Sequence, residues 1–463
     1  MVGFKALRLS GGKLAFVAAF LVGDVGSPAA TAVEPMLAGV AKVDVTPQEP
    51  VRMYGYAARK TESEGVAGRL YASALALGGD DGEGPAVLLA VDCGAVPSDL
   101  AAEVLRRVQA KVPLKPERFM LCNSHNHSGP NLKGMKSLEG EELDRLTRYA
   151  AELTRQLEQV VLQALSARAP AQLAIAHGSV GFAANRRVLK EGKWAGFGAV
   201  LDAPVDHSLP LLRITDLNGK LLAVAVNYAC HNTTLRGNFK QIHGDWAGCA
   251  QEYIEAEHPG AVALITIGCG ADADPRPHST VELCQQHGRA MADEVKRLLA
   301  GPFRSISGPL AARTAVLQVA YDSPPPMDEL REMAKRSYPA QRLLKTLEDG
   351  DPPPVSATYP LTTWTFGSDL AMVFLSHEVV VDYALRLKRD LDADRLWINA
   401  YSNDVSTYIV SQRLLGEGGY EVNNSLSALV TYGRTERLQP PLEDRIVEAV
   451  KAQLPASFQA AKK

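Results

Sequence analysis

The chain of 463 residues contains 46% hydrophobic and 22% charged residues and has a formal net charge of -3. This composition is typical of a folded globular protein and excludes the disordered and fibrous classes. A small negative charge without a block of Lys or Arg argues against nucleic acid or an anionic membrane surface as a partner. We therefore expect a small-molecule partner.

The first 32 residues have the pattern of a secretory signal. Basic residues come first, an apolar run from Leu14 to Gly23 follows, and small residues at 30–32 offer a cleavage site. This run is too short for a transmembrane helix, although an uncleaved anchor is the alternative. We expect a secreted or periplasmic mature chain of residues 33–463 that forms one domain without a transmembrane segment. Six cysteines are too few for a disulfide-built scaffold, and we predict no pairing.

Short apolar runs alternate with longer amphipathic segments, which is typical of an α/β fold. We predict a central mixed β-sheet core flanked by helices. The predicted strands are 86–91, 119–122, 222–227, 262–267, 370–375 and 397–401. The predicted helices are 99–110, 140–165, 246–257, 280–299, 326–344, 379–390 and 442–454.

Two proline clusters, at 324–326 and 352–354, bracket a charged helical segment that interrupts this alternation. We predict a lid over a site, or an inert insertion, at residues 322–360.

A His-x-His pair follows the predicted strand at 119–122. Residues 124–130 read Ser-His-Asn-His-Ser-Gly-Pro, and side chains two positions apart on an extended chain point to the same side. His125 and His127 can therefore direct both imidazoles into one metal site. Histidines that only hydrogen-bond to nearby backbone are the alternative at this point.

Polar side chains recur at the other predicted strand ends. Open α/β sheets hold their ligands beyond the carboxyl ends of the strands, and we predict a metal site there. Asp272 and Asp274 lie on a glycine-rich turn that allows close approach to a substrate, although such aspartates can also simply cap backbone amides. The residues at or just beyond strand ends are Asp92, His125, His127, His231, Asp272, Glu378 and Tyr408.

Three segments carry a family resemblance. Residues 38–47 end in Asp-Val-Thr-Pro, residues 53–57 read Met-Tyr-Gly-Tyr-Ala, and residues 125–130 read His-Asn-His-Ser-Gly-Pro. They are similar to the Asp-Ile-Thr-Pro, Gly-Tyr-Ala and His-Thr-His-Ser-Gly-Pro segments of the neutral/alkaline, non-lysosomal ceramidase family. The chain from residue 33 onward resembles the N-terminal, catalytic domain of that family.

This resemblance implies a zinc site and an amide substrate. The positions that resemble zinc ligands are His125, His231, Glu378 and Tyr408. The positions that resemble residues holding the substrate or stabilising an oxyanion are His127, Arg186 and Tyr420.

Two features depart from the family pattern. The family has Gly-Asp-Val-Ser-Pro, with an active-site serine, where residues 271–275 read Ala-Asp-Ala-Asp-Pro. Asp274 thus replaces the serine. We also expect no immunoglobulin-like C-terminal domain, because the chain ends at Lys463.

The implied reaction is hydrolysis of an N-acyl amide, in ceramide or a ceramide-like N-acyl lipid or amine. Zinc with an open position lowers the pKa of bound water to roughly 7, and this water would attack the carbonyl. Tyr420, Arg186 and a protonated His127 would donate to the oxyanion. Asp274 would accept the proton of the water or bind an ammonium group of the substrate, and it should have a partner if buried.

Two other functions stay open at the sequence level. Three aspartates could join the His-x-His pair in a two-metal phosphoesterase site: Asp92, Asp245 and Asp272. The other alternative is a secreted zinc-containing binding protein without turnover, which the replacement of the serine by Asp274 favours. No oligomeric state follows from the sequence.

Overall fold

The computed structural model describes residues 35–80, 82–434 and 441–460, together with Met1 and Gly3. The predicted signal segment at 1–32 therefore lies almost entirely outside the described residues, and the described residues from 35 onward belong to one compact unit. Among the described helices, none is long and apolar enough to cross a membrane. All six cysteines are buried free thiols.

A mixed sheet of nine strands lies at the centre of this unit, as predicted. Its order is β10-β9-β8-β5-β1-β2-β3-β4, with β12 beside β5. The β9–β10 and β3–β4 pairs are parallel and the other pairs are antiparallel. The strands are β1 (Met36–Asp44), β2 (Tyr71–Leu77), β3 (Ala86–Val91), β4 (Phe119–Asn123), β5 (Ala169–Ser179), β8 (Ser208–Asp216), β9 (Leu221–Tyr228), β10 (Val262–Ile267) and β12 (Arg304–Ile306).

A second sheet of four strands packs against the first, and the sequence did not distinguish the two. It consists of β13 (Leu310–Ala320), β14 (Ser356–Phe366), β15 (Leu370–Leu375) and β17 (Leu396–Asn399). Two smaller sheets complete the described strands: β6 (Ala183–Lys190) and β7 (Lys193–Val200) with β11 (Ala273–Pro275), and β16 (Glu378–Val379) with β18 (Tyr408–Ile409).

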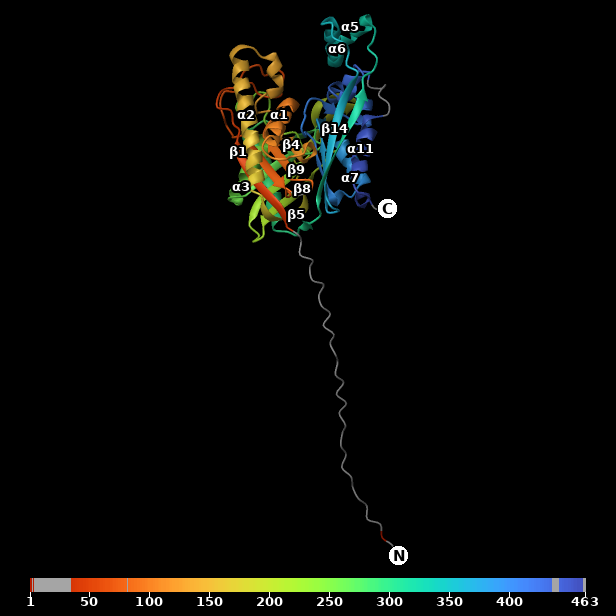
Figure 1. Ribbon diagram of the computed structural model, residues 1–463. Helices are drawn as coiled ribbons and strands as arrows, with labels where there is room; N and C mark the ends of the chain where they lie inside the picture. The colour runs from red at the N-terminus through yellow and green to blue at the C-terminus, as the bar shows by residue number, and fades with distance from the viewer. Residues whose placement is uncertain (2, 4–34, 81, 435–440, 461–463) are drawn as a thin grey trace. The chain divides into compact units, whose positions relative to one another are not determined.

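Helices cover the outer face of each large sheet, which gives four layers (Figure 1). On the nine-stranded sheet these are α1 (Ser98–Gln109), α2 (Gly140–Ser166), α3 (Asp245–Glu257) and α4 (Val281–Leu299); on the four-stranded sheet they are α7 (Val381–Asp390) and α11 (Leu442–Gln453). The other α-helices are α5 (Met327–Ala334), α6 (Tyr338–Glu348), α8 (Gln412–Glu417), α9 (Tyr420–Asn423) and α10 (Leu426–Val430).

The alternation of side chains along β9 shows how the layers pack. Val224 and Val226 contact the cluster that includes α3 and α4, whereas Ala223 and Ala225 face the second sheet, where Trp364 is fully buried. Both faces of the strand are thus covered, so its sequence is a continuous apolar run instead of an alternating one.

Two predicted helices differ from the structure. The predicted helix at 326–344 is two helices, α5 and α6, because Pro339 occupies the first turn of α6, where proline starts a helix but cannot continue one. The predicted helix at 379–390 begins at Val381, because Glu378 and Val379 pair as strand β16. The segment 322–360 contains α5, α6 and the start of β14, and its role as a lid or insertion stays a prediction.

The contact between β1 and α2 depends on a glycine. A Cβ at Gly39 would lie against the Ala164 carbonyl and 2.6 Å from the Arg168 amide nitrogen, both of which are backbone atoms. We expect Gly39→Ala to lower the free energy of unfolding by about 1–3 kcal/mol, the usual cost of overpacking, as measured by urea denaturation. Gly181→Ala is the control, because a Cβ there meets nothing within 4 Å; equal effects of the two would contradict this account.

Candidate metal centre

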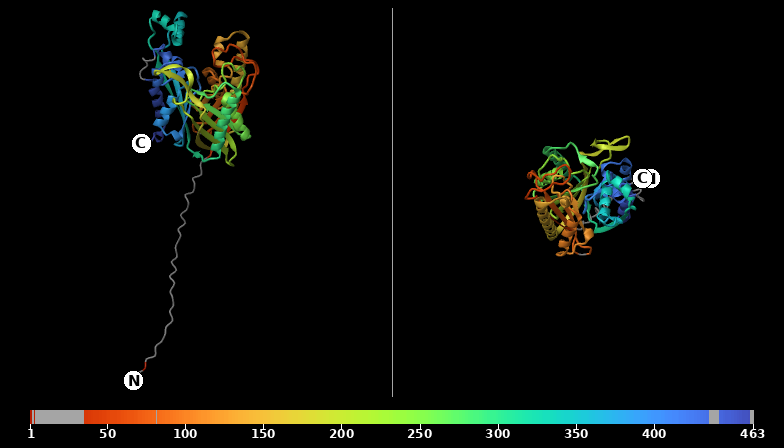
Figure 2. Two further views of the ribbon diagram at one scale, coloured as in Figure 1. Left: turned by 180° about the vertical axis from the view of Figure 1, so that it is seen from behind. Right: turned by 90° about the horizontal axis from the view of Figure 1, so that it is seen from above.

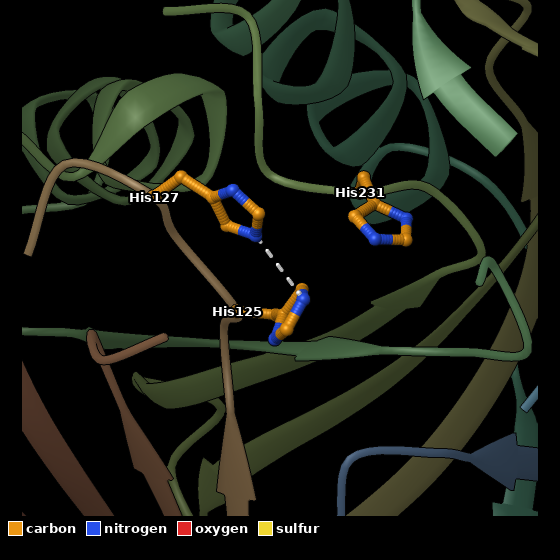
Figure 3. Close-up of side chains that lie close together, drawn as sticks. All are labelled: His125, His127 and His231. Carbon is orange, nitrogen blue, oxygen red and sulfur yellow. Dashed lines mark hydrogen bonds between the residues drawn. The ribbon is translucent and has the colours of Figure 1, made fainter. Parts of the chain in front are cut away.

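Three histidines from two loops lie together at the carboxyl ends of β4 and β9 (Figure 3). An isolated parallel bridge between Asn126 and Asn232 joins the two loops side by side. It brings His231 next to the His-x-His pair, and the ligating nitrogens of the three residues all lie within 4.8 Å of one another. The sequence predicted this meeting from the position of each histidine after a strand.

Glu378 completes the centre from the second sheet. It follows β15, and its Oε2 lies 3.3 Å from Nε2 of His125 and 3.3 Å from Nε2 of His231. Nε2 of His127 lies at the same distance, 3.3 Å, from Nε2 of His125. Two ligands that each lie about 2.0–2.1 Å from a tetrahedral zinc ion are about 3.3 Å apart. The two spacings to Glu378 therefore fit ligands around one ion better than they fit hydrogen bonds.

Backbone carbonyls set the orientation of two imidazoles. Nδ1 of His125 lies 2.7 Å from the Gly94 carbonyl oxygen, and Nδ1 of His231 lies 2.9 Å from that of Gly270. A carbonyl only accepts, so each Nδ1 carries the proton and each Nε2 presents a lone pair to the centre. This is the tautomer that binds a metal through Nε2.

The carboxylate of Glu378 also requires a cation. Its Oε2 is buried and has no hydrogen-bond partner among the described residues, which is costly for a charged oxygen. A buried carboxylate beside imidazole lone pairs fits a divalent cation.

The structure disfavours the protonated form of His127 that the sequence analysis expected. Burial first, and then the neighbouring His125 and His231, lower the pKa of His127 well below its usual value, so the ring is neutral at pH 7. Its Nδ1 faces Gly55, where a Cβ would collide with the imidazole. Only Nε2 is therefore directed at the centre.

Tyr408 lies beside Glu378 as the partner residue in the β16–β18 pair. It is buried, and its hydroxyl accepts a hydrogen bond of 3.2 Å from Arg186. Burial, and then the charge of Glu378, raise the pKa of Tyr408 well above its usual value, so its hydroxyl keeps its proton here. Its assignment as a metal ligand stays a prediction.

Arg186 is a buried cation next to the histidines. It comes from β6, and one of its terminal nitrogens lies 3.3 Å from Nε2 of His231, while its Nε donates to Glu421 at 2.9 Å. Glu421 also pairs with Arg187, which contacts Glu417 as well. Figure 2 shows the β6–β7 hairpin, in yellow, against the blue C-terminal part of the chain, where these carboxylates lie. The pairing compensates the cost of burying a guanidinium.

Sequence reasoning missed Glu417, Glu421 and the role of Arg187. Carboxylates on short helices are usually exposed, so their sequence positions gave no signal. The adjacency of Glu421 to Tyr420 was the only local clue.

Asp274 lies on β11 and has charged partners, as expected for a buried aspartate. Its carboxylate contacts Arg186 at 3.3 Å and Arg236 at 2.9 Å. Burial opposes ionisation, but the two arginines outweigh it and hold the pKa of Asp274 far below its usual value. A carboxylate with so low a pKa is a weak base, which disfavours the predicted proton-acceptor role.

Tyr420 lies at the more exposed side of the centre. It begins α9 and is 43% exposed, and its ring lies 5.8 Å from that of Tyr408. A half-exposed phenol is accessible to a bound substrate.

The three aspartates of the two-metal alternative are engaged elsewhere. Asp92 accepts from the Tyr71 amide and Asp245 from the amide of Thr234. Asp272 accepts from the Val381 amide, and burial raises the pKa of both Asp92 and Asp272 to about 6. None of these aspartates belongs to the metal-binding group that the described residues form around the three histidines, so this geometry does not support a second ion.

A family model named "Neutral/alkaline non-lysosomal ceramidase, N-terminal" matches residues 36–268, just over half of the chain. The chain belongs to this family. The matched range includes His125, His127, Arg186 and His231 but ends before Asp274. The resemblance derived from the sequence motifs is thereby confirmed.

Solved ceramidase structures share the fold. The neutral ceramidase from Pseudomonas aeruginosa superimposes with a TM-score of 0.68 at 17% identity, over 93% of this chain and 76% of that one. A ceramidase complexed with C2 gives a TM-score of 0.68 at 18% identity, over 93% of this chain and 77% of that one. The α/β architecture of this member of the ceramidase family is therefore that of the solved enzymes.

The centre predicts the metal content of the purified protein. We expect about one equivalent of zinc per chain by mass spectrometry and nearly complete loss in His231→Ala, because one ligand atom of the set is removed. His258→Ala is the control, since His258 lies at the end of α3, outside the histidine group. Two equivalents in the unmodified chain would contradict a mononuclear centre.

Proposed function

We propose that this member of the ceramidase family is a secreted or periplasmic, zinc-dependent amidohydrolase that cleaves an N-acyl amide, in ceramide or a related N-acyl lipid. The proposal rests on one observation. The buried carboxylate of Glu378 lies 3.3 Å from Nε2 of both His125 and His231, and the guanidinium of Arg186 lies beside His231. Family membership supports the amide bond as the target.

His125, His231 and Glu378, with Tyr408 as the predicted fourth ligand, would hold the zinc. Zinc bound by these residues supplies Lewis acidity and lowers the pKa of a water molecule toward neutrality. The carbonyls of Gly94 and Gly270 keep the two imidazoles oriented throughout the reaction.

The surrounding side chains stabilise the charge that develops on the amide oxygen. Arg186 is restrained by Glu421 and Asp274, so its N–H groups are directed toward the centre before the substrate binds. Such preorganised donors avoid reorganisation during the reaction. Tyr420 offers a second donor from the exposed side, and neutral His127 can exchange a proton at Nε2 with water or with the leaving amine.

A cavity whose lining is mostly apolar, but also includes Asp99, Lys133, Lys136 and Asp404, suits the aliphatic part of a lipid. Its volume is about 880 Å³, and Ala95, Leu132, Met135, Ala150 and Val405 contribute to its lining. Ala95 directly follows Gly94, whose carbonyl holds His125. A cavity of this size is within the range of ligand sites, and we propose that it holds an acyl or alkyl chain.

The proposed reaction can be tested with a neutral N-acyl amide such as ceramide. We expect zinc-loaded protein to release the fatty acid, and Arg186→Gln to lower kcat by about 100- to 1000-fold, as for the loss of one oxyanion donor, with its zinc retained. Fatty-acid release can be followed by liquid chromatography and mass spectrometry. Phosphate release from generic phosphoesters would favour the phosphoesterase alternative, and no turnover of any amide by zinc-loaded protein would favour the binding protein.

The cavity predicts a dependence on chain length. Ala150→Trp should raise KM for a long-chain N-acyl amide by about tenfold while changing KM for the acetyl analogue little, because indole fills apolar space that only the long chain needs. Thr147→Ser is the control, since it alters the same wall without filling it. Equal effects of Ala150→Trp on both substrates would show that the chain binds elsewhere.

A further inference from the structure

Three arginines share the carboxylate of Asp274, next to the centre. Asp274 contacts Arg186 at 3.3 Å, Arg236 at 2.9 Å and Arg276 at 4.0 Å. Two of these cations have no other carboxylate partner among the described residues: Arg186 alone is also paired with Glu421. Positive charge is therefore in excess around Asp274.

Arg276 is the least satisfied of the three. Its guanidinium makes no hydrogen bond to a described residue, and its Nε is buried without a partner. The ion pair with Asp274, at 4.0 Å, is longer than a charge-assisted hydrogen bond. Several N–H donors of Arg276 are thus free to bind an anion.

Arg59 adds a further cation without a carboxylate partner among the described residues. Its guanidinium donates only to backbone carbonyls, those of Tyr54, His127 and Phe239. It stacks over Tyr56, whose ring lies 5.2 Å from that of His127. A further positive charge without a carboxylate partner therefore lies next to His127.

The positive charge of Arg236 and Arg276 also affects the neighbouring His278. Burial, followed by the charges of Arg236 and Arg276, lowers the pKa of His278, so this imidazole does not add to the charge at neutral pH. The exposed fractions show where the excess lies: the side chains of Arg236 and Arg276 are 25% and 22% exposed, whereas those of Arg186 and Asp274 are 8% and 6%. Arg236 and Arg276 are therefore the outer members of the group, within reach of a bound ligand.

We propose that the substrate of this enzyme carries an anionic group close to the scissile amide, and that Arg236 and Arg276 bind that group. This inference rests on the amidohydrolase function proposed above. A carboxylate or phosphate fits the guanidinium donors, because both anions accept charge-assisted, bidentate hydrogen bonds from arginine. N-acyl amino acids and phosphorylated N-acyl amines belong to this class.

The same charges argue against the amine-bearing substrate considered from the sequence. A cationic group at Asp274 would lie next to Arg236 and Arg276 and would meet net repulsion. Asp274 instead orients these arginines and Arg186 relative to one another, as a positioning residue.

Three substrates with the same acyl chain test the inference: neutral N-lauroylethanolamine, N-lauroylglycine with a carboxylate, and N-lauroylethanolamine phosphate. We expect the native enzyme to prefer an anionic substrate, and Arg276→Gln to lower the ratio of anionic to neutral kcat/KM by about 10- to 100-fold, the value of a charged hydrogen bond. Arg276→Lys should recover part of the loss. The faster of the two anions identifies carboxylate or phosphate as the group recognised.

Arg145→Gln is the matched control, because Arg145, on α2, has a similar exposed fraction of 21% and pairs with Glu62. Arg236→Gln is the second variant, in case Arg276→Gln does not fold. Preference for the neutral amide, with a ratio that Arg276→Gln leaves unchanged, would overturn the anionic substrate and leave the amidohydrolase intact. If no amide is cleaved, the proposed function fails, and calorimetric binding of N-lauroylglycine decides the anion site: binding lost in Arg276→Gln supports it, and equal binding overturns it.

Discussion

The carboxylate of Glu378 between two imidazoles is the interaction on which the rest of the site depends. Its Oε2 is buried, lies 3.3 Å from both Nε2 atoms and has no donor among the described residues. An isolated buried charge costs far more than a fold can compensate. Glu378 follows a strand of the second sheet, whereas His125 and His231 lie on loops of the first sheet. A cation bound by all three residues would therefore also link the two sheets.

The metal centre accounts for the carboxylates that surround Arg186. Arg186 lies 3.3 Å from Nε2 of His231, a position where a guanidinium would be repelled by a bound cation unless carboxylates compensate it. Glu421 and Asp274 provide that compensation. Asp274 thus supports a donor in its position, and it draws Arg236 and Arg276 toward the same region.

The sequence predicted the parts of the site that depend on local order. A histidine or glutamate directly after an apolar strand reaches the carboxyl edge of a sheet wherever the strand lies, so His125, His231 and Glu378 could be found without a fold. The pairing of Arg187 with Glu421 joins residues 234 positions apart, and no local pattern encodes it. The division of strands into two sheets was equally hidden, because β9 and β15 are covered on both faces and both appear as uniform apolar runs.

The two flanks of the centre together constrain the shape of a substrate. The apolar cavity includes Ala95, on the His125 side, whereas the excess arginines surround Asp274, on the Arg186 and His231 side. His125 and His231 contact the same oxygen of Glu378. An amide bound at the centre would therefore have the cavity on its His125 side and the arginines on its His231 side. An amphiphile with an aliphatic chain and an anionic head satisfies both flanks. A purely apolar ligand would offer no partner to the unpaired donors of Arg276.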